Sequence, residues 1–260
     1  MTRCFPTSTA VLWLRLERAL TAGLLPRHYQ SESPHILIES YVGEYLEQEI
    51  AMEAATRNMP AFSRFLEVAA FSNGEIVNYQ NIARECGVSA PTVAWYFGIL
   101  EDTLLGRFLP AFRKRKKRRT ILAPKFYFFD VGLVGALAKR GTVRRGSEVF
   151  GKAMEHYICM ELCAHARYSG LRYPVTYWRT ASQLEVDFIL GDHEVAVEVK
   201  SAELVQTHHV RGMRAFKEEL HARRYIVVSL DPEARRCEDG IEILPWERFL
   251  KDLWDGRVMK

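Results

Sequence analysis

The chain has 260 residues, 48% of them hydrophobic and 26% charged, which is ordinary for a globular protein with room for two domains. No apolar run approaches the roughly 20 residues that a membrane span needs. The amino-terminal apolar stretch is broken by Arg15 and Glu17, unlike a secretory signal. Five cysteines without a CxxC pair fit reduced thiols. We therefore expect a cytoplasmic protein with no membrane partner; the sequence does not indicate its oligomeric state.

The spacing of apolar residues predicts a helical segment over residues 1–60. Apolar residues at helical intervals predict a first helix that ends at Gly23 and Pro26, and a second that begins near Pro34. The apolar face of the second helix holds Ile38, Tyr41, Val42, Tyr45, Leu46 and Ile50. Two helices do not obviously make a domain, so we interpret the segment as the end of another module or as a brace on the next domain.

Residues 61–140 have the layout of a winged helix. The helices "FSRFLEVAAF" and "NYQNIARECG" precede a third, with Gly87 in the turn, Ser89 as N-cap and Pro91 in the first turn. Strands are expected at "LLGRFLPAF" and "PKFYFFD". The third helix is then the DNA-reading helix. Candidates for its exposed face are Thr92, Trp95 and Tyr96, of which the last two suit the core equally well.

The basic excess of the chain lies in one segment between those two strands. The net charge is +4, but without this segment 29 Lys and Arg residues face 32 Asp and Glu, a balance of −3. Such a concentration indicates an interaction patch, and DNA is the expected partner. The segment consists of Arg113, Lys114, Arg115, Lys116, Lys117, Arg118 and Arg119.

Residues 145–260 follow an α/β pattern. A helix over 148–167 is expected first, followed by strands at "VTYWR", "LEVDFIL" and "VAVEVK", a helix through Met213 and Phe216, the strand "RYIVVSL", and "GIEIL" before a last helix. The helical crossover before "RYIVVSL" favours parallel pairing of this strand. The fold class is therefore α+β, with a helical segment and a winged helix followed by an α/β domain.

Charged residues alternate with valines in two neighbouring strands of this domain. Alternation places Asp187 on one face of the first strand, and Glu198 and Lys200 on one face of the second. A four-residue turn "GDHE" would set Asp187 opposite Glu198, whereas a two-residue turn would set Glu185 opposite Glu198. Two neighbouring carboxylates repel each other, which raises the pKa of one of them unless a cation lies between them. Mg²⁺ commonly binds one or two protein carboxylates.

Glu155, on the preceding helix among apolar neighbours, is a further candidate for this metal site. Two other interpretations remain open. The hairpin face could be solvated and hold cross-strand ion pairs worth about 0.2–1 kcal/mol each, and Glu155 could reach solvent at a helix edge. His156, Cys159 and Cys163 share a helix face but have no evident fourth zinc ligand, so buried packing is expected for them.

The order of these elements, with Asp187 followed by Glu198-Val199-Lys200, resembles the PD-(D/E)xK nuclease superfamily. The resemblance implies a restriction-endonuclease-like domain in which Asp187, Glu198, Lys200 and Glu155 are catalytic, with Glu155, Asp187 and Glu198 binding Mg²⁺ or Mn²⁺. The sequence departs from the pattern in having "EVD" where a proline usually precedes the aspartate.

A wider resemblance covers about residues 18–254. The stretches "GVSAPTVAWYFGILEDTLL", "PKFYFFDVGL", "YWRTASQLEVDFIL" and "AVEVKSA" resemble the carboxy-terminal half (domain of unknown function, family 4143) of bacterial and archaeal AAA-type ATP-binding proteins. Residues 1–60 would then be the remnant of the ATPase module, and any ATP would be bound by an absent or separate ATPase partner in trans.

The stretch "GSEVFGKA" at residues 146–153 matches the spacing of a P-loop but does not supply the ATP-binding site of that module. Ala153 stands where a Ser or Thr would bind magnesium, and Glu148 would place a negative charge in the phosphate cradle. We expect Lys152 to be a solvated residue on the first helix of the α/β domain.

Two functions therefore compete. The chain is either a nucleic-acid-binding module with a non-catalytic nuclease-like scaffold, which we favour from the sequence, or a Mg²⁺-dependent endonuclease acting on DNA.

Overall fold

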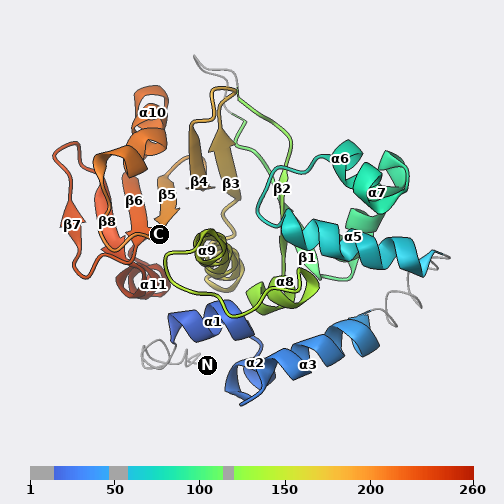
Figure 1. Ribbon diagram of the computed structural model, residues 1–260. Coiled ribbons are helices and arrows are strands. Elements are labelled where there is room, and N and C mark those ends of the chain that lie inside the picture. The colour runs from blue at the N-terminus through green and yellow to red at the C-terminus, as the bar shows by residue number, and fades with distance from the viewer. Residues whose placement is uncertain (1–14, 47–57, 114–119) are drawn as a thin grey trace. The chain divides into compact units, whose positions relative to one another are not determined.

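The computed structural model describes residues 15–46, 58–113 and 120–260, and it has the mixed helix and sheet content expected of the α+β class (Figure 1). The chain divides into two compact units. Of the described residues, the amino-terminal unit comprises 17–46, 58–110 and 123–144, and the carboxy-terminal unit comprises 15–16, 111–113, 120–122 and 145–260. In the described part of the chain, no helix combines the length and apolarity needed to cross a bilayer.

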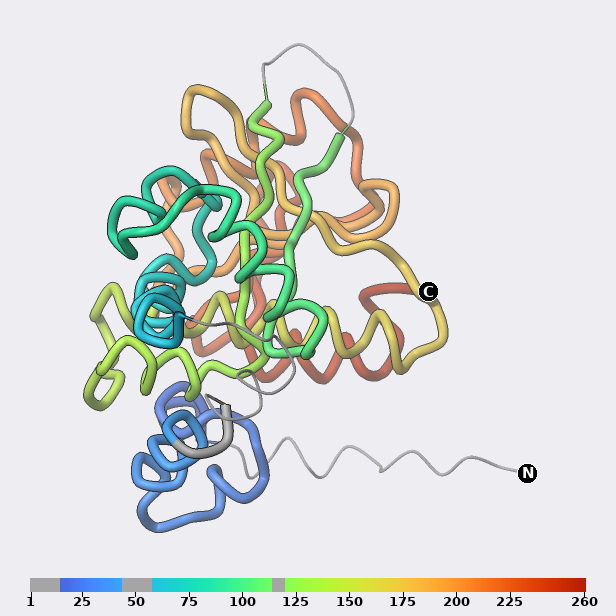
Figure 2. Tube along the Cα trace, turned by 90° about the vertical axis from the view of Figure 1, so that its right-hand side faces the viewer, coloured from blue at the N-terminus to red at the C-terminus, as the bar shows by residue number. Residues whose placement is uncertain are grey.

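The amino-terminal unit is built mostly from helices. They are α1 (Leu16–Ala22), α2 (Pro26–Gln30), α3 (Pro34–Ser40), the π-helix η2 (Tyr41–Leu46), α5 (Met59–Phe71), α6 (Tyr79–Cys86), α7 (Ala90–Asp102) and α8 (Val131–Leu137). Strands β1 (Gly106–Leu109) and β2 (Lys125–Phe128) form an antiparallel hairpin (Figure 2). Ile76, between α5 and α6, adds an antiparallel bridge to Lys125.

The predicted turn chemistry between α6 and α7 is confirmed. Gly87 ends α6 in the left-handed region with φ 67°, which glycine adopts at little steric cost. Ser89 Oγ accepts a hydrogen bond from Thr92 N at 3.3 Å and caps α7, and Pro91 lies in the first turn. Behind these helices, the core is an aromatic cluster that includes Phe65, Tyr96, Phe97 and Phe126.

Asp130 joins the first helices to the rest of this unit. Its Oδ1 accepts hydrogen bonds from Gly132 N and Leu133 N at the start of α8, and its Oδ2 accepts one from Leu24 N at 2.7 Å. A side chain at Gly23 would collide with this carboxylate, since a Cβ there would lie 2.1 Å from Oδ1. The described helices of residues 17–46 therefore pack as part of the same unit as the predicted winged helix.

The carboxy-terminal unit is a six-stranded sheet in the order β3-β4-β5-β6-β8-β7. Its strands are β3 (Val175–Arg179), β4 (Glu185–Leu190), β5 (Val195–Lys200), β6 (Arg224–Ser229), β7 (Arg235–Arg236) and β8 (Glu242–Pro245). β3, β4 and β5 pair antiparallel, whereas β5, β6 and β8 are parallel. The parallel pairing expected after the helical crossover is confirmed.

The helices of this unit cover both faces of the sheet (Figure 1). They are α9 (Glu148–Tyr168), the 3₁₀ helix η3 (Thr207–Val210), α10 (Arg211–Glu219) and α11 (Trp246–Trp254). Met213 and Phe216 of α10 pack with Ala196 of β5 and Val227 of β6. α9 packs on β5, and α11 packs on β6 and against α9.

The described residues on either side of the basic segment, 111–113 and 120–122, lie beside the edge strand β3. Ala111 bridges Tyr177 in parallel, and Phe112 N donates to Tyr177 O at 2.7 Å. On the return, Thr120 bridges Thr180 antiparallel, and Ile121 N donates to Arg179 O at 2.9 Å. Both flanks of the basic segment are thus fixed to the sheet of the carboxy-terminal unit, whereas the sequence had suggested only the wing of a winged helix.

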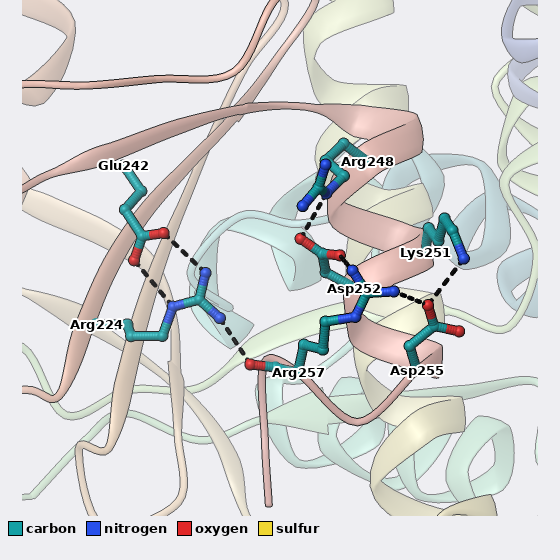
Figure 3. A network of polar contacts seen from close by, with 7 residues as sticks. All are labelled: Arg224, Glu242, Arg248, Lys251, Asp252, Asp255 and Arg257. Atoms are coloured by element: carbon teal, nitrogen blue, oxygen red, sulfur yellow. Dashed lines mark hydrogen bonds and ion pairs between the residues drawn. The ribbon is translucent and has the colours of Figure 1, made fainter.

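A second polar network fastens the carboxy-terminal residues (Figure 3). Arg224 donates from Nε and Nη2 to the two carboxylate oxygens of Glu242, both at 2.9 Å, and from Nη1 to Arg257 O at 2.8 Å. Arg257 forms ion pairs with Asp252 and Asp255, and Arg248 with Asp252. Each acid in this network has at least one cationic partner.

Candidate functional site

The register of β4 and β5 brings the predicted acidic residues together. Leu190 pairs with Val195 and Phe188 with Val197, so the four residues of "GDHE" form the turn, as the first alternative predicted. Continuing this register by one residue sets Asp187 opposite Glu198. Val199 N donates to Asp187 Oδ2 at 2.7 Å, which holds the aspartate against β5.

Glu198 has an incompletely satisfied carboxylate. Its Oε1 lies 2.5 Å from Lys200 Nζ, while its buried Oε2 has no hydrogen-bond partner among the described residues. Burial raises the pKa of Glu198, Lys200 opposes that shift, and the negative charges of Glu185 and Glu155 add to it. A buried charged oxygen without a partner is costly, so this position calls for a cation or a proton.

Lys200 remains the cationic member of the cluster. Burial by itself would lower its pKa, but the charges of Glu198, Asp187 and Glu155 outweigh burial and raise it. Its side chain keeps partial exposure to solvent. Lys200 is therefore protonated at neutral pH and balances only one of the neighbouring carboxylates.

Glu155 reaches this cluster from α9. Gly151, one turn earlier, lies against Ser201, because a Cβ at Gly151 would be 3.1 Å from Ser201 Oγ. That contact fixes the start of α9 beside the end of β5. Glu155 is half-buried, and it is close enough to influence the pKa values of both Glu198 and Lys200.

The predicted three-carboxylate cage is not assembled. Among the described residues, no group of three or more His, Cys, Asp or Glu side chains is placed to hold a metal ion. Asp187 and Glu198 are also buried, at 6% and 5% exposure. The half-exposed rim above them consists of Glu155, Glu185 and Lys200.

Two carboxylates still fit a magnesium-type site. Mg²⁺ usually keeps several waters and takes one or two protein carboxylates together with substrate phosphate oxygens. Asp187 and Glu198 supply those two carboxylates, and Glu198 Oε2 is a donor atom that the described residues leave unused. The donor set therefore suits a hard divalent cation, with Glu155 placed to act from the rim.

Glu185 is a site residue that the sequence analysis did not select. The charge of Glu185 raises the pKa of Glu198 more than the charge of Glu155 does. The available signal was its position in "EVD", since residues two apart on a strand share a face. Glu185 forms an ion pair with Arg179 across the strands, with Nη1 and Oε2 3.0 Å apart.

The predicted DNA-reading residues divide between surface and core. Trp95 is 48% exposed on α7, whereas Tyr96 is buried in the aromatic core. Thr92 is half-buried, and its Oγ1 lies 2.8 Å from Ser89 Oγ within the cap of α7. Arg113 is exposed, and the predicted contacts from Lys114, Arg115, Lys116, Lys117, Arg118 and Arg119 lie outside the described residues.

Two other predictions on α9 can be placed. Lys152 lies in the first turns of the helix and pairs with Glu148 at 3.2 Å, as expected of a surface lysine rather than a phosphate-binding loop. His156, Cys159 and Cys163 are all buried, as expected for packing residues.

Comparison with known families gives two matches. Residues 14–144 match the family model described as Domain of unknown function (DUF8612), and residues 150–249 match the model described as Domain of unknown function (DUF4143). The first match spans just over half of the chain. No curated protein and no solved structure matched the sequence.

Proposed function

The chain belongs to the family described as Domain of unknown function (DUF8612), and we propose that it acts on DNA through a divalent-metal-dependent phosphodiesterase site in its carboxy-terminal unit. The observation that carries this proposal is the unpartnered, buried Oε2 of Glu198 beside Asp187 and Lys200. The DUF4143 match and the strand order support the restriction-endonuclease-like interpretation of this unit.

In this mechanism, Asp187 and Glu198 would hold the cation, and Glu155 would contribute from the rim. A bound Mg²⁺ or Mn²⁺ would lower the pKa of a water molecule and neutralise charge on the phosphate. Lys200, protonated and two residues beyond Glu198, orients the attacking water and offsets negative charge that develops on the phosphate. Val199 N keeps Asp187 in place beside β5, where its carboxylate would help to hold the cation.

DNA is recruited, in this proposal, by the winged helix and by the basic segment. The element order supports the winged helix: three helices, with a bridge to the hairpin between the first two, are followed by β1 and β2. The described flanks of the basic segment are hydrogen-bonded to β3 of the carboxy-terminal unit, which supports a role for this segment beside that unit. If about four basic residues touch phosphates, log K falls against log salt with a slope near −4.

The recruitment step is tested by replacing Lys114, Arg115, Lys116 and Lys117 with alanine. The variant should flatten the salt dependence of binding to duplex DNA while retaining folding. An unchanged slope, or no DNA binding by the wild type at low salt, would reject this role.

The catalytic step is tested with plasmid and linear DNA incubated with Mg²⁺ or Mn²⁺. The wild type should cut only with metal, and Asp187→Ala should not cut while still binding DNA. Persistent cleavage by Asp187→Ala would remove this site from the mechanism.

A second candidate function is DNA binding without cleavage. The specific observation in its favour is the burial of Asp187 and Glu198, together with the Lys200 ammonium that already occupies Glu198 Oε1. In that case the wild type binds DNA but cuts under no divalent metal.

The ATPase association remains a prediction from the resemblance. The placement of Lys152 on α9 supports the expectation that this chain alone does not bind ATP. Micromolar ATP affinity that is lost in Lys152→Ala would contradict it, and an ATPase partner in trans would restore ATP dependence only when added.

A further inference from the structure

Arg179 lies beside the carboxylate cluster, on the edge strand of the sheet. Arg179 and Glu185 are direct partners in the β3–β4 register, and their ion pair is 3.0 Å long. The other side of the guanidinium is held by Gln183, whose Oε1 accepts hydrogen bonds from Arg179 Nε at 3.1 Å and from Nη2.

Glu185 connects this arginine to the cluster. Glu185 stands two residues before Asp187 on β4, so the two carboxylates share one face of the sheet. Its backbone is fixed by α10, since a Cβ at Gly212 would lie 1.9 Å from Glu185 O, and only glycine allows that approach. The Arg179–Glu185 pair therefore lies on the same face of the sheet as the Glu198–Lys200 pair.

The turn that presents Gln183 has an unusual backbone. Gln183 has φ 67°, in the left-handed region that residues with a side chain rarely adopt. Such outliers persist where the surroundings impose them, and they occur often at binding sites. Here the outlier holds the amide of Gln183 against Arg179.

A purely structural arginine–glutamate pair exists in the same sheet for comparison. Arg224 and Glu242 have 19% side-chain exposure each, against 23% and 22% for Arg179 and Glu185. Arg224 uses two hydrogen bonds to Glu242 and a third to Arg257 O, which fastens the chain end. Arg179 has one contact with Glu185, and its carbonyl accepts from Ile121, where the chain returns from the basic segment.

We propose that Arg179 is a phosphate-recognition residue of the carboxylate cluster, with Glu185 as its resting partner. When nucleic acid binds, the guanidinium passes from Glu185 to a non-bridging oxygen of the backbone phosphate. Glu185 then adds its negative charge to the cation-binding side of the cluster. The exchange is feasible because partly exposed ion pairs contribute little net stability, and because arginine binds phosphate in a fork geometry.

This inference rests on the proposed function for its substrate class, and its test uses DNA binding rather than cleavage. The probe is a fluorescently labelled duplex oligonucleotide, titrated by anisotropy at several salt concentrations with Ca²⁺ in place of Mg²⁺. Arg179→Ala should lower affinity about tenfold and reduce the salt slope by about one. Arg179→Lys should keep the slope and lose part of the affinity, because it retains charge without the fork.

Arg224→Ala is the matched control, and it should leave affinity and slope unchanged while lowering the melting temperature. Direct Mn²⁺ titration gives a second readout: Glu185→Gln should weaken Mn²⁺ binding, whereas Arg179→Ala should leave it equal or tighter. Thermal unfolding confirms that each variant is folded. If Arg179→Ala does not fold, Arg179→Gln replaces it in the titrations.

DNA affinity and salt slope unchanged in Arg179→Ala would overturn the inference, as would equal losses in Arg179→Ala and Arg224→Ala. This outcome is distinct from failure of the proposed function, in which the wild type binds no Mn²⁺ and cuts no DNA. Even then, the anisotropy titration decides whether Arg179 binds phosphate.

Discussion

The network around Arg224 and Arg257 and the cluster around Glu198 both place acidic and basic side chains next to one another in the carboxy-terminal unit (Figure 3). In the network, Glu242 is bound through both oxygens, and Lys251 lowers the pKa of Asp255. In the cluster, one oxygen of Glu198 has no hydrogen-bond partner in the described part of the chain, and burial raises the pKa of this residue. The first arrangement stabilises the fold, whereas the second retains unbalanced charge that a ligand can satisfy.

The largest difference between the two regions should be seen in catalysis. Lys200→Ala should slow Mg²⁺-dependent cleavage by about 10- to 100-fold, a loss expected for groups that support a metal site, because the ammonium group proposed to orient water and offset phosphate charge is gone. DNA affinity should change little. Arg257→Ala, which removes a cation from the network, should cut at the wild-type rate. Equal rates for wild type and Lys200→Ala in initial-velocity assays would contradict the assignment.

Stability should respond most strongly in the network. Arg224→Ala removes hydrogen bonds to a charged and partly buried carboxylate, and it should lower the free energy of unfolding by about 2 kcal/mol. Urea denaturation followed by circular dichroism measures the change. A loss below the error of that measurement would show that the network does not fasten the chain end.

In the cluster, removing a charge should raise the free energy of unfolding rather than lower it. Glu198→Gln should raise the free energy of unfolding by about 1 kcal/mol at pH 8 in EDTA, because a neutral amide avoids the burial cost and the repulsion from Glu185 and Glu155 that raise the pKa of Glu198. Glu242→Gln, the matched change in the network, should lower it. Destabilisation by both substitutions would erase the distinction between the regions.

The pH dependence comes from the raised pKa of Glu198. Between its ordinary value near 4.5 and the raised folded-state value, the folded protein binds more protons than the unfolded chain. This residue's contribution to stability is therefore greatest below that window and falls as the pH rises through it. The advantage of Glu198→Gln over wild type in EDTA should be small at pH 4.5 and larger at pH 8.

Much of this arrangement can be predicted from alternation and turn chemistry in the sequence. The apolar residues around Asp187 and Glu198 predict β4 and β5, and "GDHE" gives the register that sets the acids opposite each other. The caps at Ser89 and Gly87 are equally local signals. Short helices were harder to predict: α2 has five residues, and α8 contains two glycines and depends on Asp130 for its cap.

The features that the sequence could not provide depend on contacts between distant segments. The flanks of the basic segment bond to β3 across more than fifty residues, and no local pattern predicts such pairing. The burial of the carboxylates depends on how α10 and α9 approach the sheet at Gly212 and Gly151. The role of Glu185 likewise emerges only when Arg179 is found as its cross-strand partner.

The central claim, that the Glu198 cluster retains charge in order to bind a divalent cation, is tested most directly by Mn²⁺ binding to the metal-free protein. Electron paramagnetic resonance should detect Mn²⁺ bound by the wild type and released by excess Mg²⁺. Glu198→Gln should lose this binding, and Glu242→Gln should keep it. No bound Mn²⁺ in the wild type, or binding that survives Glu198→Gln, would contradict the account.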